Sequence, residues 1–313
     1  MLSLLHPAVR TGAGEISRQF ASAQPFRHVV IEPFLDPDFC RELIESFPRF
    51  ETRYARNERG EPGGKAVVPN ITSLGPPYVR FDQLMRDPEF LKLTGEITGI
   101  PGLLYDKDYA GGGTHENIDG QELDSHVDFN YHPARPWHRR LNLIVFLNPE
   151  WDEQWGGCLE LLRNPSVTSG DGKRTVLPLA NRAVIFETTE SSWHGFPRIQ
   201  VPPGRNLSRK SIAVYFYTKQ RPADQIAPSH GTLYFQRPLP ERIRPGYTLQ
   251  EQDMSELALL LDRRDTHIRF LYERERKFSN LIAAITNSVS FKIGRGLTWP
   301  ARALKSLAGR KDP

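Results

Sequence analysis

Residues 141–147 have the sequence Leu-Asn-Leu-Ile-Val-Phe-Leu, a β-branched and apolar run that predicts a buried strand. Similar runs lie at 158–162, 183–186 and 211–217, with Gly, Pro and Asn residues between them. This series of short, closely spaced strands predicts that residues 103–218 form a β-rich core of the jelly-roll type.

Helices are predicted before and after this core. Asp36-Pro37 suits the N-cap and first position of one helix, and residues 82–98 predict a second helix that Pro88 divides. Residues 50–75 are charged and rich in Gly and Pro, which predicts a long loop. The expected fold class is α+β and β-rich: a double-stranded β-helix (jelly-roll) core with N-terminal supporting helices and a C-terminal helical extension.

The composition divides the chain into five parts. They are an arm or short covering helix at 1–25, the jelly-roll domain at 26–222, a Pro-rich connector at 223–250, a helix at 251–290 and a basic amphipathic tail at 291–313. The tail holds six basic residues and one acidic residue, whereas the net charge of all 313 residues is only +4. The rest of the chain is therefore close to neutral, which argues against a nucleic-acid partner.

The predicted C-terminal helix has apolar residues at heptad spacing, and Arg264 and Glu275 interrupt them. The apolar residues are Leu257, Leu261, Ile268, Leu271, Phe278, Ile282, Ile285 and Val289. The pattern suits a helix packed on its own domain, or a coiled coil that joins two chains in a homodimer. The tail after it suits peripheral contact with a membrane surface, or a packed or disordered end.

The compartment is predicted from cysteine use and hydropathy. Cys40 and Cys158 are too few for a disulfide scaffold and fit a reducing environment. No apolar run is long enough to span a membrane, and the start of the chain is too short and interrupted for a secretory signal. We expect a cytoplasmic protein, with a peripheral position at the inner face of the membrane as the alternative.

The candidate site begins with His126-Val127-Asp128, because residues two apart on a strand share one face. His194 lies at the start of a second predicted strand. Two imidazoles and one carboxylate can hold a ferrous ion on one side and leave its other side open to oxygen and a chelating co-substrate. Zinc, which could use the same ligands with a water in a hydrolase, is the alternative metal.

A basic anchor is predicted on the last strand of the core. Arg209 and Ser211 share one face, so a guanidinium and a hydroxyl could bind one carboxylate of the co-substrate together. Lys210 is expected to point to the opposite face, and Arg205 is a competing basic residue.

These motifs together resemble the prolyl 4-hydroxylase-like branch of the 2-oxoglutarate/Fe(II)-dependent dioxygenase superfamily. They are His126-x-Asp128, Gly156-Gly157-Cys158-Leu159, Phe186, His194-Gly195 and Arg209-x-Ser211. A mostly bacterial subgroup is similar at Asp128-Phe-Asn-Tyr-His-Pro133, Arg139-Arg-Leu-Asn-Leu143 and Leu147-Asn148. The resemblance covers about residues 28–220.

The resemblance implies roles for individual residues. His126, Asp128 and His194 would be the iron ligands and catalytic residues, and Arg209, Ser211, Asn142 and Tyr109 would bind 2-oxoglutarate. Asn142 or Tyr109 is included because Phe146 stands where such enzymes often have a tyrosine. The presence of Asp128 disfavours halogenation, since halogenating relatives lack this carboxylate. Ascorbate is expected as a stimulating reductant.

The expected activity is hydroxylation of an unactivated C–H bond, with succinate and CO2 as co-products. The resemblance favours a prolyl residue or a proline-like substrate, and hence a small-molecule or protein/peptide partner. The tail also resembles segments that end some bacterial glycan-building enzymes, which makes a saccharide or lipid-linked glycan precursor the alternative substrate. A non-catalytic jelly-roll scaffold that binds metal and ligand is a third interpretation.

Overall fold

The computed structural model describes residues 1–51, 55–56, 62–166, 172–236, 238–240 and 242–299. The chain separates into two units, Met1–Phe235 and Gln236–Pro313. The first unit is longer at both ends than the jelly-roll domain predicted at 26–222, because the N-terminal arm and part of the connector belong to it.

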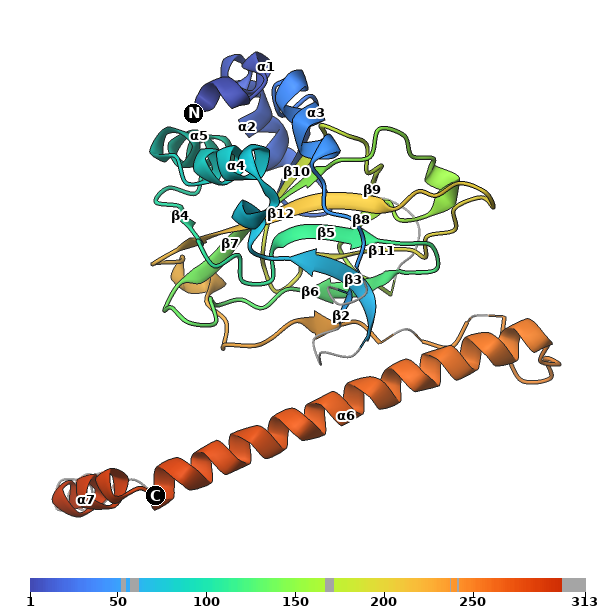
Figure 1. The fold of residues 1–313 in the computed structure, drawn as a ribbon. Helices are drawn as coiled ribbons and strands as arrows, with labels where there is room; N and C mark the ends of the chain where they lie inside the picture. The colour runs from blue at the N-terminus through green and yellow to red at the C-terminus, as the bar shows by residue number, and fades with distance from the viewer. Residues whose placement is uncertain (52–54, 57–61, 167–171, 237, 241, 300–313) are drawn as a thin grey trace. The chain divides into compact units, whose positions relative to one another are not determined.

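The α-helices of the first unit lie together on one side of its sheets (Figure 1). The helical segments are η1 (Leu2–Leu4), α1 (Pro7–Thr11), α2 (Ala13–Ser22), α3 (Pro37–Glu45), η2 (Ile71–Leu74), α4 (Pro76–Met85), α5 (Pro88–Thr98), η3 (Glu153–Trp155) and η4 (Ala223–Gln225). Asp36 caps α3 by accepting from the amides of Asp38 and Phe39, as its position before Pro37 predicts. Pro88 begins α5, so the predicted break between two helices is confirmed.

The strands form two antiparallel sheets. In spatial order, the larger sheet contains β1 (His28–Ile31), β10 (Ala183–Glu187), β7 (His138–Phe146), β12 (Arg209–Thr218), β5 (Gly113–Asn117), β3 (Pro62–Val68) and β2 (Ala55–Arg56), with β4 (Leu104–Tyr105) also paired to β12. The smaller sheet contains β13 (Leu233–Tyr234), β6 (Leu123–Val127), β11 (Trp193–Phe196), β8 (Leu159–Leu162) and β9 (Lys173–Val176). This architecture confirms the predicted α+β jelly-roll class.

Alternation along the strands divides the core of this unit in two. Ile212, Val214 and Phe216 of β12 pack with the helices in one apolar cluster. Residues that face the other way, such as Phe146 of β7, pack against Leu159 and other side chains of the smaller sheet. The two sheets therefore enclose an interior, and the candidate site residues lie on this inner face.

Two segments differ from the sequence prediction. The predicted loop at 50–75 contains β2, β3 and η2. β3 is a strand because its backbone pairs with β5, at Val67 opposite His115, so its conformation comes from the neighbouring strand more than from its own composition. Within the Pro-rich connector, β13 pairs with β6 at Tyr234 opposite His126, which a two-residue strand cannot signal by periodicity.

The second unit contains α6 (Glu251–Asn287) and α7 (Val289–Leu297). The predicted helix at 251–290 is thus one long helix that ends at Asn287, and Ser288, which follows it, caps α7 through its hydroxyl. Of the tail predicted at 291–313, residues 300–313 lie outside the described residues. Among the helices described, none is long and apolar enough to cross a membrane.

Candidate metal centre

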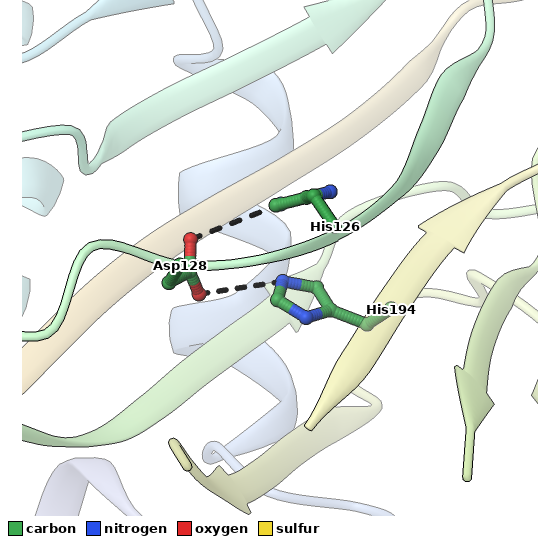
Figure 2. Close-up of side chains that lie close together, drawn as sticks. All are labelled: His126, Asp128 and His194. Atoms are coloured by element: carbon green, nitrogen blue, oxygen red, sulfur yellow. Dashed lines mark ion pairs between the residues drawn. The ribbon is translucent and has the colours of Figure 1, made fainter. Parts of the chain in front are cut away.

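Two imidazoles and a carboxylate converge between β6 and β11, as Figure 2 shows. His126 and His194 are opposite each other in the antiparallel pairing of these strands, with ring centroids 4.3 Å apart. Asp128 follows β6, and its two carboxylate oxygens are 3.8 Å from Nε2 of His126 and 3.4 Å from Nε2 of His194. The structure therefore brings together the three predicted ligands.

Backbone carbonyls fix the orientation of both imidazoles. Nδ1 of His126 lies 2.9 Å from the carbonyl oxygen of Asp124, and Nδ1 of His194 lies 3.0 Å from that of Ser192. A carbonyl can only accept, so each Nδ1 carries the proton and donates it. Each Nε2 consequently presents a lone pair toward Asp128, which is the tautomer that a metal needs.

A buried polar network holds Asp128. Its Oδ2 accepts from Asn142 Nδ2 at 2.8 Å and forms an ion pair with Arg139 at 3.1 Å. Arg139 in turn donates to Oδ1 of Asn142 from two nitrogens, at 3.0 and 2.8 Å. Its guanidinium is stacked over Tyr215, 3.5 Å from the ring centroid. Arg139 belongs to a motif quoted from the sequence but was assigned no role there; in the structure it fixes the carboxylate.

The protonation states of the three ligands suit metal binding. Burial, and after it the neighbouring imidazole of His194, lowers the pKa of His126 to about 3. Burial also lowers the pKa of His194. For Asp128 burial is the largest influence and acts in the opposite sense, but Arg139, the two imidazoles and the hydrogen bond from Asn142 together outweigh it and hold the pKa below the usual range. At neutral pH the set is two neutral imidazoles and one carboxylate, so a metal has no proton to displace.

The donor set fits a divalent metal with an open side. Ligands at right angles, each about 2.1 Å from one ion, are separated by about 3 Å. The imidazole nitrogens lie 3.8 and 3.4 Å from the two different oxygens of Asp128, and one ligand atom from each residue lies within 4.8 Å of the others, so an inward movement would complete this geometry. The three side chains are at most 10% exposed, which limits competition from water. A facial set of two His and one carboxylate is the set typical of non-haem Fe(II) oxygenases.

Arg209 is a buried cation on the same inner face. It is 4% exposed, and within the described residues no acidic side chain pairs with it. Its Nε donates to the carbonyl of Gly157 at 2.6 Å, and its guanidinium carbon lies 4.3 Å from the ring centroid of Phe196. Burial lowers its pKa to about 10, so the charge is retained at neutral pH. The two terminal nitrogens remain for an anion that arrives as a ligand.

Strand register relates Arg209 to the metal ligands. Ser211 pairs with Phe146 of β7, and Tyr215 pairs with Asn142, so these residues share the inner face. Phe146 is next to Arg209, and Asn142 contacts Asp128. Asn142 and Phe146 are four residues apart on β7, a strand length of about 13 Å. Two side chains and a five-carbon dicarboxylate can bridge that length.

Other predicted positions behave differently. Lys210 lies over the ring of Phe47 on the helical side, as predicted, and Ser211 is buried on the inner face. Asn142 lies beside the cluster, but its amide hydrogen-bonds with Asp128 and Arg139, so it orients the Asp128 carboxylate. The structure does not bring Tyr109 to the site, because its side chain packs in the helix-covered cluster and its hydroxyl donates to Asp82 of α4.

His115 of β5 is a further inner-face residue that the sequence did not single out for a role. It pairs with Ser211 across the strands, and its buried Nε2 has no hydrogen-bond partner. Burial, followed by the charges of Lys65 and Arg209, lowers its pKa well below the usual value. It is therefore a neutral imidazole within electrostatic reach of both Arg209 and Asp128.

A second group of potential ligands is already neutralised. Asp106, Asp108 and His132 lie close together, but Arg135 donates to Asp106 at 3.0 Å and to Asp108 at 2.6 Å. The guanidinium occupies the place that a cation would take.

Two glycines of the predicted motifs are needed for close approach. A Cβ at Gly195 would lie 2.5 Å from the carbonyl oxygen of Leu123, so a side chain there would separate β11 from β6. Gly157 has a positive φ of 68°, and a Cβ there would lie 3.3 Å from Arg209 Cδ. Both glycines therefore support the placement of site residues.

Comparison with known proteins agrees with this geometry. Residues 113–217 match the sequence model of the 2OG-Fe(II) oxygenase superfamily, a segment that includes all three ligands and Arg209. The match covers about a third of the chain, and over that segment it agrees with the predicted family, enzyme class and cofactors, Fe(II) and 2-oxoglutarate. No curated protein matches the chain.

Several solved structures are similar to this chain at low identity. A Pseudomonas putida prolyl-4-hydroxylase is 17% identical, with a TM-score of 0.41 over 67% of this chain and 94% of its own. Prolyl 4-hydroxylases from Phytophthora capsici give 16% identity and a TM-score of 0.47 over 82% and 73% of the two chains. HygX from Streptomyces hygroscopicus, with nickel and 2-oxoglutarate bound, gives 12% identity and a TM-score of 0.43 over 66% and 92%.

Proposed function

We propose that this chain, a member of the 2OG-Fe(II) oxygenase superfamily, hydroxylates an unactivated C–H bond of a prolyl residue or a proline-like ring. The observation that carries the proposal is a pairing on one inner face: two neutral imidazoles and one carboxylate lie together, and a buried guanidinium has no acidic partner among the described residues. The first suits Fe(II), and the second suits the far carboxylate of 2-oxoglutarate.

Each residue has a defined task in this proposal. His126, Asp128 and His194 would hold the metal, and Arg209 would fix the co-substrate end-on through its terminal nitrogens. When bound, Fe(II) and 2-oxoglutarate would activate O2, of which one atom would enter the substrate C–H bond and the other the keto acid, which would leave as succinate and CO2. Phe146, Phe196 and the buried side chains around them would exclude water from the anchor.

Aromatic side chains beside Asp128 support a nonpolar ring as the substrate group. Phe129 and Tyr215 lie on either side of the Arg139 guanidinium, at 4.3 and 3.5 Å from their ring centroids, and both are partly exposed. Their exposed surface next to the metal carboxylate suits contact with a pyrrolidine ring, whose carbons carry the C–H bonds to be oxidised.

The test follows succinate formed from 2-oxoglutarate by the Fe(II)-loaded chain in air, with and without proline-containing peptides or free proline. A peptide that gains one oxygen atom at proline, with matching succinate, would support the proposal. His126→Ala and Arg209→Ala should abolish both products, and Arg205→Ala, a surface arginine paired with Glu150, should not. Succinate without any oxidised proline would reject the substrate class but retain the oxygenase.

The alternative substrate, a saccharide or lipid-linked glycan precursor, has one supporting feature. In α7, Lys292 and Arg295 alternate with the exposed apolar residues Ile293 and Leu297, which suits the surface of a membrane. Sedimentation with anionic lipid vesicles, lost when residues 290–313 are deleted, would favour this alternative. Equal behaviour of both chains would remove its support.

A further inference from the structure

The long helix α6 carries an exposed apolar stripe with two charged interruptions. Leu261, Ile268 and Phe278 are 59%, 46% and 51% exposed. Together with their apolar neighbours they repeat at alternating steps of four and three residues, which is the spacing of a coiled-coil seam. Arg264 and Glu275 occupy two positions of this same seam. A charge in a buried seam is costly unless an opposite charge meets it.

We propose that α6 joins two copies of the chain in an antiparallel coiled coil, in which Arg264 of each copy pairs with Glu275 of the other. In this arrangement, each seam residue that is followed by the next seam residue after three positions faces one that is followed by the next after four positions. The layers would be Met254 with Ile285, Leu257 with Ile282, Leu261 with Phe278, Arg264 with Glu275, and Ile268 with Leu271. Beside the seam, Leu260 would lie near Leu281 of the second copy, which widens the apolar contact.

Charge selects this register over the others. A parallel pair in register would place Arg264 against Arg264 and Glu275 against Glu275, which is repulsive at both layers. An antiparallel pair shifted by one heptad would place Arg264 against an apolar residue, either Ile268 or Ile282. Only the proposed register matches apolar with apolar and basic with acidic throughout.

The length of α6 agrees independently with this register. The proposed two-fold axis passes between Arg269 and Phe270. The helix runs from Glu251 to Asn287, so its midpoint is residue 269. Two helices paired about this axis would overlap along their full length. The apolar stripe therefore has a partner at every turn.

The pair cannot form within one helix. Arg264 and Glu275 are separated by eleven residues, which is about 16 Å along the helix axis. Side chains interact along a helix at spacings of three or four residues. A charge exchange between these two positions therefore reports on contact between copies.

The first experiment measures the mass of the full chain by sedimentation equilibrium. We expect twice the single-chain mass of 35.7 kDa. Arg264→Glu and Glu275→Arg should each raise the dimer dissociation constant about tenfold or more, since each creates two like-charge layers per dimer. The double variant should restore the wild-type constant. The matched controls Arg263→Glu and Glu273→Arg change the same charges outside the seam and should leave the dimer intact.

The second experiment determines orientation. Leu257→Cys and Ile282→Cys are prepared separately, and Cys40 and Cys158 are both buried in the wild-type chain. In a glutathione redox buffer, an equimolar mixture should form a disulfide-linked dimer, whereas neither variant alone should do so. Cross-linking of either variant alone would indicate a parallel pair and overturn the proposal. A monomeric wild-type chain, a mass above two chains, or no rescue by the double exchange would overturn it as well.

Discussion

Arg209→Met should stabilise the ligand-free chain while it removes the binding of 2-oxoglutarate. The guanidinium is 4% exposed and lacks an acidic partner among the residues described. A pKa of about 10 in place of 12.5 corresponds to a destabilisation of the charged form of about 3 kcal/mol. Loss of the hydrogen bond to Gly157 destabilises the variant by about 1 kcal/mol, which offsets part of this gain. The net gain of about 2 kcal/mol would raise the Tm by about 4 °C or more.

The same replacement has a large cost for the ligand. Two charge-assisted hydrogen bonds from the terminal nitrogens to a carboxylate contribute about 1.5 to 3 kcal/mol each. Their loss should weaken 2-oxoglutarate binding at least about 100-fold. A residue that merely supported the fold would show the opposite result, with a lower Tm and an unchanged affinity.

The assay combines thermal denaturation of the metal-free chain with titration calorimetry of 2-oxoglutarate into the Zn²⁺-loaded chain, which does not turn over. Arg205→Met serves as the control, because Arg205 is a surface residue paired with Glu150. If Arg209→Met lowered the Tm by several degrees and kept the affinity, the assignment of Arg209 as an anchor would be refuted.

Three further predictions concern the metal ligands and their support. Asn142→Ala, which removes the amide that holds Asp128, should weaken metal binding about 10- to 100-fold in a competition assay with a chelator, and an unchanged affinity would contradict the network. The Tm of the metal-free chain should fall as the pH is lowered from about 7 to 5. Burial keeps the pKa of His126 in the folded chain below 6.5, so in this range the unfolded chain binds the extra proton and becomes more stable relative to the folded one. His126→Gln should make the decline of Tm with falling pH less steep, and an equally steep decline would argue against the buried neutral imidazole. Gly195→Ala should lower both Tm and metal affinity by separating β11 from β6, whereas Gly14→Ala on α2, where a Cβ meets nothing, should leave metal affinity unchanged.

The sequence predicts the metal ligands because their signals are local. His126 and Asp128 share a strand face by simple alternation, and His194 lies at the start of a strand that can be recognised on its own. Arg209 was predicted in the same way, since strand alternation separates it from Lys210. The family match then covers these same residues.

The residues that contact the predicted ligands are positioned by the register between strands, which composition does not encode. Asn142 and Tyr109 were equal candidates for one polar role, but Asn142 meets Asp128 across the two sheets and Tyr109 packs with the helices. Arg139 looks like one of several basic residues near a turn, yet it is among the most buried side chains of the first unit. β3 and β13 were missed because pairing with a neighbour, and no apolar pattern, makes them strands.

The short strand β13 has a consequence for dissecting this protein. It pairs with β6, the strand that carries His126, and it lies beyond the segment that matches the family. A fragment that stopped at residue 222 would leave β6 as an open sheet edge, with unpaired backbone groups next to a metal ligand. Such edges recruit other strands, so the fragment would tend to aggregate, and any loss of metal binding would reflect an uncovered edge. The smallest fragment suitable for study of the site therefore ends after Phe235, where the first unit itself ends.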